Sequence, residues 1–124
     1  MVRTRLKLVK MNKTYLQGDI WTIRLDPSKG SEIKKTRPCL IISRSKINKK
    51  LNTVIIIPFS SGETDKSILQ INVKKSKQNG LRLDSHLVIP QIRTVSKKRF
   101  IKRLGPIEKK YVPHIMRSFE LYFW

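Results

Sequence analysis

The feature that most limits what this chain can fold into is a series of short apolar runs, rich in β-branched residues and ended by turn-forming residues. Such runs between Gly, Pro, Ser and Asn predict strands. In residues 19–25 the side chains alternate between two sides, beginning with Ile20 and Trp21, as in a half-buried strand. The same reasoning predicts strands at 38–43, 53–59, 67–73 and 85–94, and allows a last short one at 99–104.

The period of the apolar residues changes after Gly105 and Pro106. Ile115, Phe119 and Tyr122 follow the spacing of a helical stripe. Because proline is tolerated in a first turn, Pro113 leaves two alternatives: a helix that begins near Val112, or an earlier helix that is kinked there. The aromatic end, 119–124, is expected to pack on the strands or on a second subunit.

Five or six short strands followed by one helix predict a mainly β fold, a small barrel with a C-terminal α-helix. Closure of the barrel would hide the strand edges. A chain of 124 residues is long enough for one compact core and too short for two. We therefore expect a single domain at 18–124, preceded by a basic N-terminal arm at 1–17.

The charge of the chain points to a polyanionic partner. Its 28 Lys and Arg against 8 Asp and Glu leave a net charge of +20, spread over the whole chain. Nucleic acid is the first expectation, an acidic protein the second and an anionic membrane surface the third. No apolar run approaches the roughly 20 residues of a membrane span, and the basic arm lacks the features of a secretory signal. The expected location is therefore cytoplasmic.

The residues that usually make metal or covalent chemistry are sparse. Cys39 is the only cysteine, which excludes an internal disulfide, and the Leu and Ile residues after it indicate a buried thiol. His86 and His114 are 28 positions apart, and each is expected at the surface or at a barrel edge. The scattered acidic residues suggest turn and strand-end roles rather than metal ligation. We expect neither a metal nor a cofactor.

Polar residues beside the predicted strands are the candidates for binding a phosphate. They lie in the loop before the second strand, at the end of the third strand and in the fifth. The set comprises Ser31, Glu32, Lys34, Lys35, Thr36, Arg37, Ser60, Ser61, Gln91, Arg93 and Thr94. The basic stretches 44–52, expected to be a loop, and 97–103 are either backbone clamps for nucleic acid or plain solvated surface.

Three blocks of this sequence resemble a known family. GDIWTIRLDPSKGSEIKKTRPCLIIS at 18–43 has that family's GD-I-aromatic start and its LDP, GSE and TRP motifs. VIIIPFSSG at 54–62 resembles its third-strand segment, and LRLDSHLVIPQIRTVSKKRF at 81–100 resembles its DS and QIRT block. In this order and spacing, the blocks resemble the MazF/PemK (Kid) toxins.

The resemblance implies an SH3-like barrel of the CcdB/MazF type that works as a homodimer and cuts single-stranded RNA at a short sequence. It also implies an acidic antitoxin as partner. The TRP arginine falls on Arg37 and the hydroxyl residue that ends the third strand falls on Ser60, which makes these the expected catalytic residues. The remaining candidates, from Ser31 to Thr94, are then expected to bind RNA or to support the site.

The residues also make chemical sense for RNA cleavage without a metal. RNA carries its own nucleophile, the 2′-OH, so a protein needs only to align it and to stabilise charge on the phosphate. Arg37 offers a planar fork and Ser60 a hydroxyl donor. Some family members carry an acidic residue where this chain has Pro90 and a basic one where it has Val88, so the general base stays open.

Other interpretations of the same residues stay open at this point. Arg37 can simply bind phosphate or pair with Glu32, Ser60 and Ser61 can cap a strand, and Gln91 and Arg93 can belong to a dimer interface. At the level of the whole protein, the alternatives to a ribonuclease are a CcdB-like poison of DNA gyrase and a non-catalytic RNA-binding module.

Overall fold

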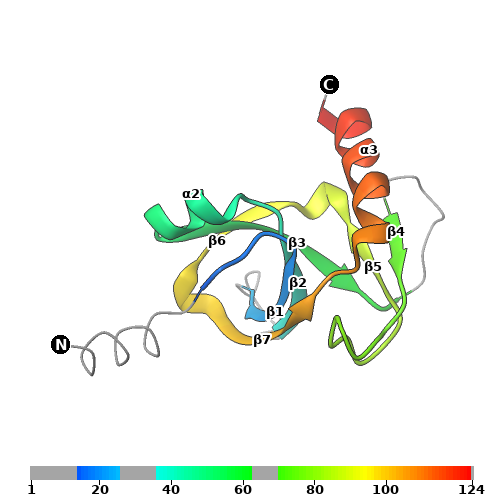
Figure 1. The fold of residues 1–124 in the computed structure, drawn as a ribbon, viewed down its shortest axis with the longest axis horizontal. Coiled ribbons are helices and arrows are strands. Elements are labelled where there is room, and N and C mark those ends of the chain that lie inside the picture. Colours follow the sequence, from blue (N-terminus) through cyan, green and yellow to red (C-terminus); the bar gives the residue numbers. More distant parts are fainter. Residues whose placement is uncertain (1–13, 26–35, 63–69, 124) are drawn as a thin grey trace, which may run out of the picture.

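The computed structural model describes residues 14–25, 36–62 and 70–123. Across these residues, seven antiparallel strands form one sheet and a helix follows at the C-terminus (Figure 1). In chain order the strands are β1 (Asp19–Arg24), β2 (Thr36–Ile41), β3 (Thr53–Ser60), β4 (Gln70–Val73), β5 (Ser85–Val88), β6 (Arg93–Ser96) and β7 (Phe100–Pro106). The α-helices are α2 (Ser45–Lys50) and α3 (Val112–Phe123), and short 3-10 helices cover Ile89–Gln91, Lys97–Arg99 and Lys109–Tyr111. The predicted mainly β fold with a C-terminal helix is confirmed.

Strand β3 is the centre of the sheet, whose order is β4-β5-β3-β2-β1-β7. One edge of β3 pairs with β2, and its other edge carries both β5, at Phe59 and Ser60, and β6, at 53–56. β4 and β7 end the path, and no ladder joins them within the described residues. Within the described residues the sheet is therefore not closed into a barrel by hydrogen bonds, unlike the closed barrel expected from the sequence.

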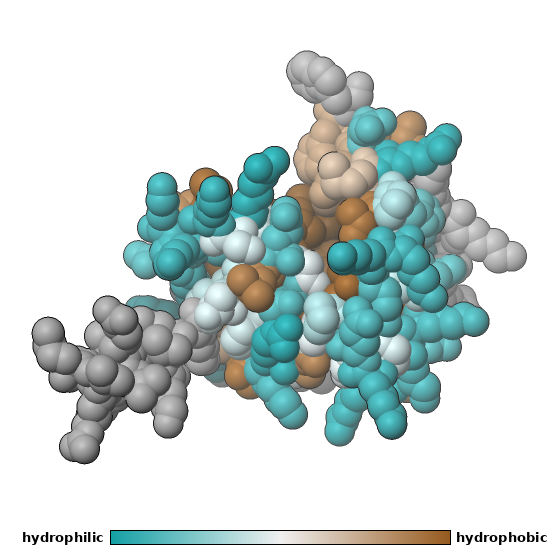
Figure 2. Space-filling model, viewed as in Figure 1, coloured by the Kyte–Doolittle hydropathy of each residue, from teal (hydrophilic) through white to brown (hydrophobic). Residues whose placement is uncertain are grey.

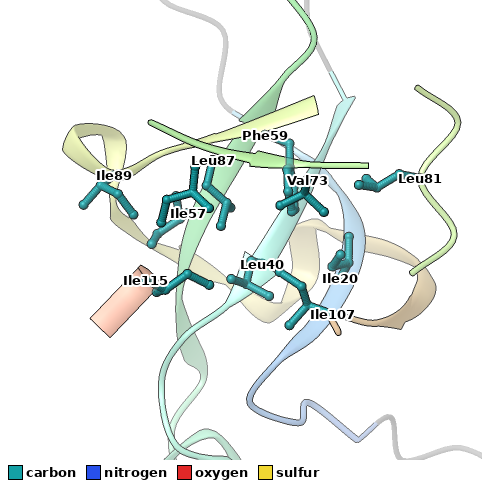
Figure 3. Close-up of a cluster of buried hydrophobic side chains, with 11 residues drawn as sticks. Ile20, Leu40, Ile57, Phe59, Val73, Leu81, Leu87, Ile89, Ile107 and Ile115 are labelled. Atoms are coloured by element: carbon teal, nitrogen blue, oxygen red, sulfur yellow. The ribbon is translucent and has the colours of Figure 1, made fainter. Parts of the chain in front are cut away.

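The apolar interior lies on both faces of the central strands, which explains why their sequences are nearly continuous apolar runs. One cluster contains Leu40, Ile57 and Phe59, and Ile115 of α3 packs into it (Figure 3). The other cluster contains the alternate residues of the same strands, Cys39, Ile56 and their neighbours. The prediction of a buried Cys39 is confirmed.

The segment 44–52, which the sequence suggested to be a loop, contains the helix α2, so that expectation was wrong. Asn48 is buried at 1% exposure, and its amide nitrogen donates to the main-chain oxygens of Tyr15 at 2.9 Å and Ser43 at 3.0 Å. The Ser43 hydroxyl donates to the amide oxygen of Asn48 and accepts from the N–H of Ile55. A polar residue thus anchors this short helix, and a search for apolar periodicity does not detect such an anchor.

The expectation of one continuous strand at 85–94 was also wrong, because this stretch contains β5, a turn and the start of β6. Residues Ile89–Gln91 form a 3-10 turn that separates β5 from β6. Pro90 lies in its first turn and has no N–H to give to a ladder, and the N–H of Ile92 bonds to the oxygen of Ile89 at 3.0 Å. The break lets the two halves pair with different parts of β3.

The ends of other elements differ by a few residues from the expectation. β2 begins at Thr36 and β7 extends to Pro106, while residues 67–69 of the expected fourth strand lie outside the described residues. α3 begins at Val112 with Pro113 in its first turn, so the first of the two alternatives is correct. Along its stripe Ile115 is buried and Phe119 packs on the core, but Tyr122 is 42% exposed.

Residues near the N-terminus also contact the sheet. Tyr15 stacks on Trp21 and meets Phe100 edge to face, and the ammonium group of Lys97 lies 5.0 Å from the centre of its ring. The N–H of Gln17 bonds to the Ser45 hydroxyl. Residues 1–13 of the expected basic arm lie outside the described residues.

Candidate active site

A cleft of about 820 Å³ opens at the ends of β2 and β3 and runs to β1, β7 and the segment before β5. Four of the candidate residues line it: Thr36, Arg37, Ser60 and Ser61. They come from strands that are neighbours in the sheet and far apart in the sequence. The structure therefore brings the two residues expected to be catalytic, Arg37 and Ser60, into one cavity.

The register of β2 and β3 explains this meeting. The ladder between the two strands ends where Cys39 pairs with Pro58. Arg37 lies two residues before Cys39 and Ser60 two residues after Pro58, so both residues lie at the same end of the paired strands. The Nη1 of Arg37 also approaches the main-chain oxygen of Phe59, at 3.5 Å. The guanidinium thus lies over the end of β3, beside the serine.

The Ser60 hydroxyl makes one local hydrogen bond, and it can still donate a hydrogen bond of its own. It accepts a 3.4 Å hydrogen bond from the N–H of Gly62, where the chain leaves β3. A hydroxyl that accepts in this way keeps its own hydrogen as a donor. Ser60 therefore has a strand-end contact and can still donate to a group in the cleft.

The pKa of the Cys39 thiol is affected by burial and by positive charge on the face of the sheet that carries Arg37. Burial raises its pKa to about 12, and the positive charges of Arg93 and Arg37 oppose that shift. Arg93 pairs with Ile56, which in turn pairs with Ile41, so Arg93 lies on the same face as Arg37 but further along β3. Two guanidinium groups thus act on one surface, although Arg93 is not among the residues that line the cleft.

The other candidates of the QIRT motif, Gln91 and Thr94, do not line the cleft either. Gln91 belongs to the 3-10 turn, and Thr94 pairs with Ile55, so it points to the face opposite that of Arg93. The side chains of Gln91, Arg93 and Thr94 are all exposed. The candidates Ser31, Glu32, Lys34 and Lys35 lie outside the described residues.

The sequence reasoning missed several residues that line the cleft: Thr22, Arg82, Leu83, Ser85 and Lys102. Thr22 pairs with both Pro38 and Lys102, so these three form a row across β2, β1 and β7. In the sequence, Lys102 is one of several basic residues at 97–103. No spacing in the sequence indicates that Lys102, rather than its basic neighbours, lies in the cleft, because the row forms only when the strands pair.

The two histidines differ in their surroundings. His86 is 3% exposed and pairs with Ser60 on one side and Asn72 on the other, so the expectation of a surface or edge position was wrong for it. His114 lies exposed on α3, as expected. Among the described residues, no three His, Cys, Asp or Glu side chains gather as a metal site would require. No helix in the described part of the chain is long and apolar enough to cross a membrane.

The fold and the cleft define a class of protein: a small, strongly basic β domain in which an arginine and a serine from neighbouring strands line one cleft. A family model described as PemK-like, MazF-like toxin of type II toxin-antitoxin systems matches residues 16–123. The chain belongs to this family of toxins, and the resemblance seen in the sequence is confirmed.

Individual relatives agree with this assignment. Endoribonuclease MazF of Staphylococcus epidermidis is 35% identical over 89 residues, which are 71% of this chain and 73% of that protein. Endoribonuclease MazF9 of Mycobacterium tuberculosis is 22% identical over 111 residues, covering 86% and 93% of the two chains.

Solved structures show the same fold. Toxin MazF-mt6 of Mycobacterium tuberculosis superimposes with a TM-score of 0.71 at 20% identity, over 85% of this chain and 95% of that one. A MazE-MazF structure from Deinococcus radiodurans gives 0.72 at 14% identity, over 89% and 96%. The SH3-like, CcdB/MazF-type barrel implied by the resemblance is therefore confirmed as the fold.

Proposed function

We propose that this protein is a toxin endoribonuclease that cuts single-stranded RNA, such as mRNA, at a short sequence without a metal ion. One observation carries the proposal: Arg37 and Ser60, from two different strands, line one cleft. The net charge of +20 supports it, because an RNA strand is a polyanion. The names of the relatives support it as well, since several are endoribonucleases.

The proposed step is an intramolecular transesterification. The 2′-oxygen bonds to the adjacent phosphorus, the bond from phosphorus to the 5′-oxygen breaks, and the products are a 2′,3′-cyclic phosphate and a 5′-OH. The 2′-OH loses its proton and the leaving 5′-oxygen gains one. The protein must align the groups and stabilise the charge on the phosphate oxygens.

Arg37 and Ser60 stabilise the charge on the phosphate oxygens. A guanidinium presents two parallel N–H groups that match two phosphate oxygens, and it stays charged at any working pH. The Ser60 hydroxyl adds one donor from the opposite strand. Thr36 and Ser61, which line the same cleft, are assigned to RNA binding.

The other candidates keep supporting roles in this proposal. Arg93 adds positive charge to the face of Arg37, as its effect on Cys39 indicates. Gln91 and Thr94, outside the cleft, would contact RNA further along the strand or hold the site in place. Ser31, Glu32, Lys34 and Lys35 precede β2 in the sequence and would approach RNA from there.

The proposed partners are a second copy of the chain and an acidic antitoxin. Apolar side chains gather along α3 and at its base (Figure 2), and on this helix Val112, Met116, Leu121, Tyr122 and Phe123 are 42–59% exposed. Such a patch suits burial in a homodimer. A partly disordered acidic segment would complement the basic cleft, and an endoribonuclease of the same fold has been solved with its cognate antitoxin. The proposed location is the cytoplasm, where mRNA is available.

The test is direct. The purified protein is incubated with a mixed-sequence RNA in EDTA, and the ends of the fragments are analysed. The proposal expects discrete fragments that carry 5′-OH and cyclic phosphate ends, and an Arg37→Ala variant that makes very few of them. Intact RNA, together with DNA that is broken only when gyrase is added, would show a gyrase poison instead. Intact RNA that is nevertheless bound would show a non-catalytic RNA-binding module.

A further inference from the structure

The cleft is longer than the catalytic pair requires. From Arg37 and Ser60 it extends to an apolar wall formed by Leu81, Leu83 and Leu104. Leu81 is 6% exposed and belongs to the core, but Leu83 is 59% exposed. A volume of about 820 Å³ exceeds what one phosphate group needs and lies in the range of small-molecule sites, roughly 300–1,000 Å³.

The segment that carries Leu83 is held firmly at several points. The N–H of Leu81 bonds to the Asn79 side-chain oxygen at 3.0 Å, and the Ser85 hydroxyl bonds to the main-chain oxygen of Leu83 at 2.8 Å. Between them, Asp84 accepts the N–H of Lys75 at 2.9 Å. An exposed leucine on an anchored segment is a preformed apolar surface, and a preformed surface loses little entropy when a ligand packs on it.

Two cations lie at this part of the cleft. Arg82 precedes Leu83 and is exposed, and Lys102 extends from β7 beside Thr22. An apolar surface and positive groups in one cleft match the chemistry of a nucleotide strand, in which flat bases alternate with phosphates.

We propose that Leu83 is the surface on which a nucleobase next to the scissile phosphate packs, while Arg82 and Lys102 bind the flanking phosphates. This inference rests on the proposed ribonuclease and names the part of the cleft that selects the RNA sequence. Leu83 contacts the base, and the half-buried residue Thr22 bonds to the edge of that base through its hydroxyl. The Ser85 hydroxyl positions Leu83 by donating to the main-chain oxygen of Leu83. Arg37 and Ser60 act on the phosphate alone.

The first experiment maps every cut on a long mixed-sequence RNA for the wild type and for Leu83→Ala, by sequencing the 5′-OH ends. Loss of the packed side chain should lower kcat/KM about tenfold. The base preference at one position beside the cut should relax, while the preferences elsewhere stay. A Leu83→Phe variant should restore the rate, because a ring packs well on a base. The matched control is Leu16→Ala, a leucine of 42% exposure that precedes β1 and does not line the cleft.

The second experiment separates the cations from the leucine. Arg82→Ala and Lys102→Ala should each reduce the slope of log kcat/KM against log salt by about 0.7 and leave the base preference as it is. Lys109→Ala, an exposed lysine on a 3-10 turn away from the cleft, should leave the slope unchanged.

The outcomes distinguish the two proposals. Wild-type protein that leaves RNA intact would overturn the ribonuclease itself. Wild-type protein that cuts, together with a Leu83→Ala variant that cuts the same sites at the same rate, would overturn the role of Leu83 alone. An equal loss of rate at all sites, with no change of base preference, would also contradict it, since that is the result of a structural defect.

Discussion

The guanidinium of Arg37 on β2 donates to the main-chain oxygen of Phe59 on β3, at 3.5 Å, and Phe59 is followed directly by Ser60. This contact is long, so it costs little to break when a phosphate approaches. Arg37 is therefore positioned by the neighbouring strand and available to a ligand in the cleft.

Arg37→Ala should lower kcat for RNA cleavage by about 10²- to 10³-fold, because one donor to the developing phosphate charge is lost. Arg37→Lys should recover only part of the rate, since an ammonium group keeps the charge and loses the fork. Initial rates on a short fluorescent RNA measure both. Lys109→Ala, at an exposed position in the 3-10 turn Lys109–Tyr111, is the control with full activity. An alanine variant at position 37 that cuts at the wild-type rate would remove Arg37 from the active site.

Substitutions of Ser60 separate the hydroxyl from the rest of the side chain. Ser60→Ala removes the donor and should lower kcat by about 10- to 100-fold, whereas Ser60→Thr keeps the hydroxyl and should retain most of the activity. KM should change little in either case, because the contact strengthens in the transition state. Single-turnover kinetics at saturating RNA provide the measurement. Equal rates for the two variants would mean that Ser60 serves only as a strand end.

The turn at 78–80 and Gly105 make a close approach that only glycine permits. Gly105 is buried with φ +156°, and a Cβ there would lie 2.0 Å from the main-chain oxygen of Gln78. Gly105→Ala should therefore lower the free energy of unfolding by about 2–4 kcal/mol. Gly18→Ala is a useful comparison: its φ is +91°, but nothing lies within 4 Å of the added Cβ, so the loss should be only about 1–2 kcal/mol. Urea unfolding compares the two, and equal losses would contradict the steric argument.

Glu108 connects the turn after β4 to the segment before α3. The Ser76 hydroxyl donates to one carboxylate oxygen at 2.6 Å and the Asn79 amide to the other at 3.0 Å. Partial burial acts to raise the pKa of Glu108, but these hydrogen bonds outweigh it, and the pKa lies below its ordinary value of 4.5. Since the folded pKa is depressed, the stabilisation is present at neutral pH and is lost as the pH falls through the folded pKa.

Glu108→Gln should thus lower the free energy of unfolding at pH 7, and the difference from the wild type should shrink as the pH is lowered past 4.5. Urea unfolding between pH 3 and about pH 7 follows this difference. Glu120→Gln, at an exposed position on α3, provides the baseline for loss of one negative charge. A Glu108 difference that is constant over the whole pH range would show that the carboxylate charge is not involved.

The sequence predicted the elements that depend on local pattern. The runs around Ile20, Leu40 and Ile57 became the central strands, and the spacing from Ile115 to Phe119 became α3. Local pattern did not predict the elements whose structure depends on a partner distant in the sequence. Asn48 forms the anchor of α2 through Tyr15, which is 33 residues away, and the run 85–94 breaks at Pro90 because its two halves pair with different parts of β3.

The candidate site divides in the same way. By itself, the sequence determined the residue types and the motifs, and from these came the family and the assignment of Arg37 and Ser60. Only the tertiary structure decided which side chains meet: it placed Leu83, Arg82 and Lys102 in the cleft and left Gln91 and Thr94 outside it. The reason is physical, because strand register sets which residues lie opposite each other, and pairing of strands distant in sequence is fixed by the packing of the whole core.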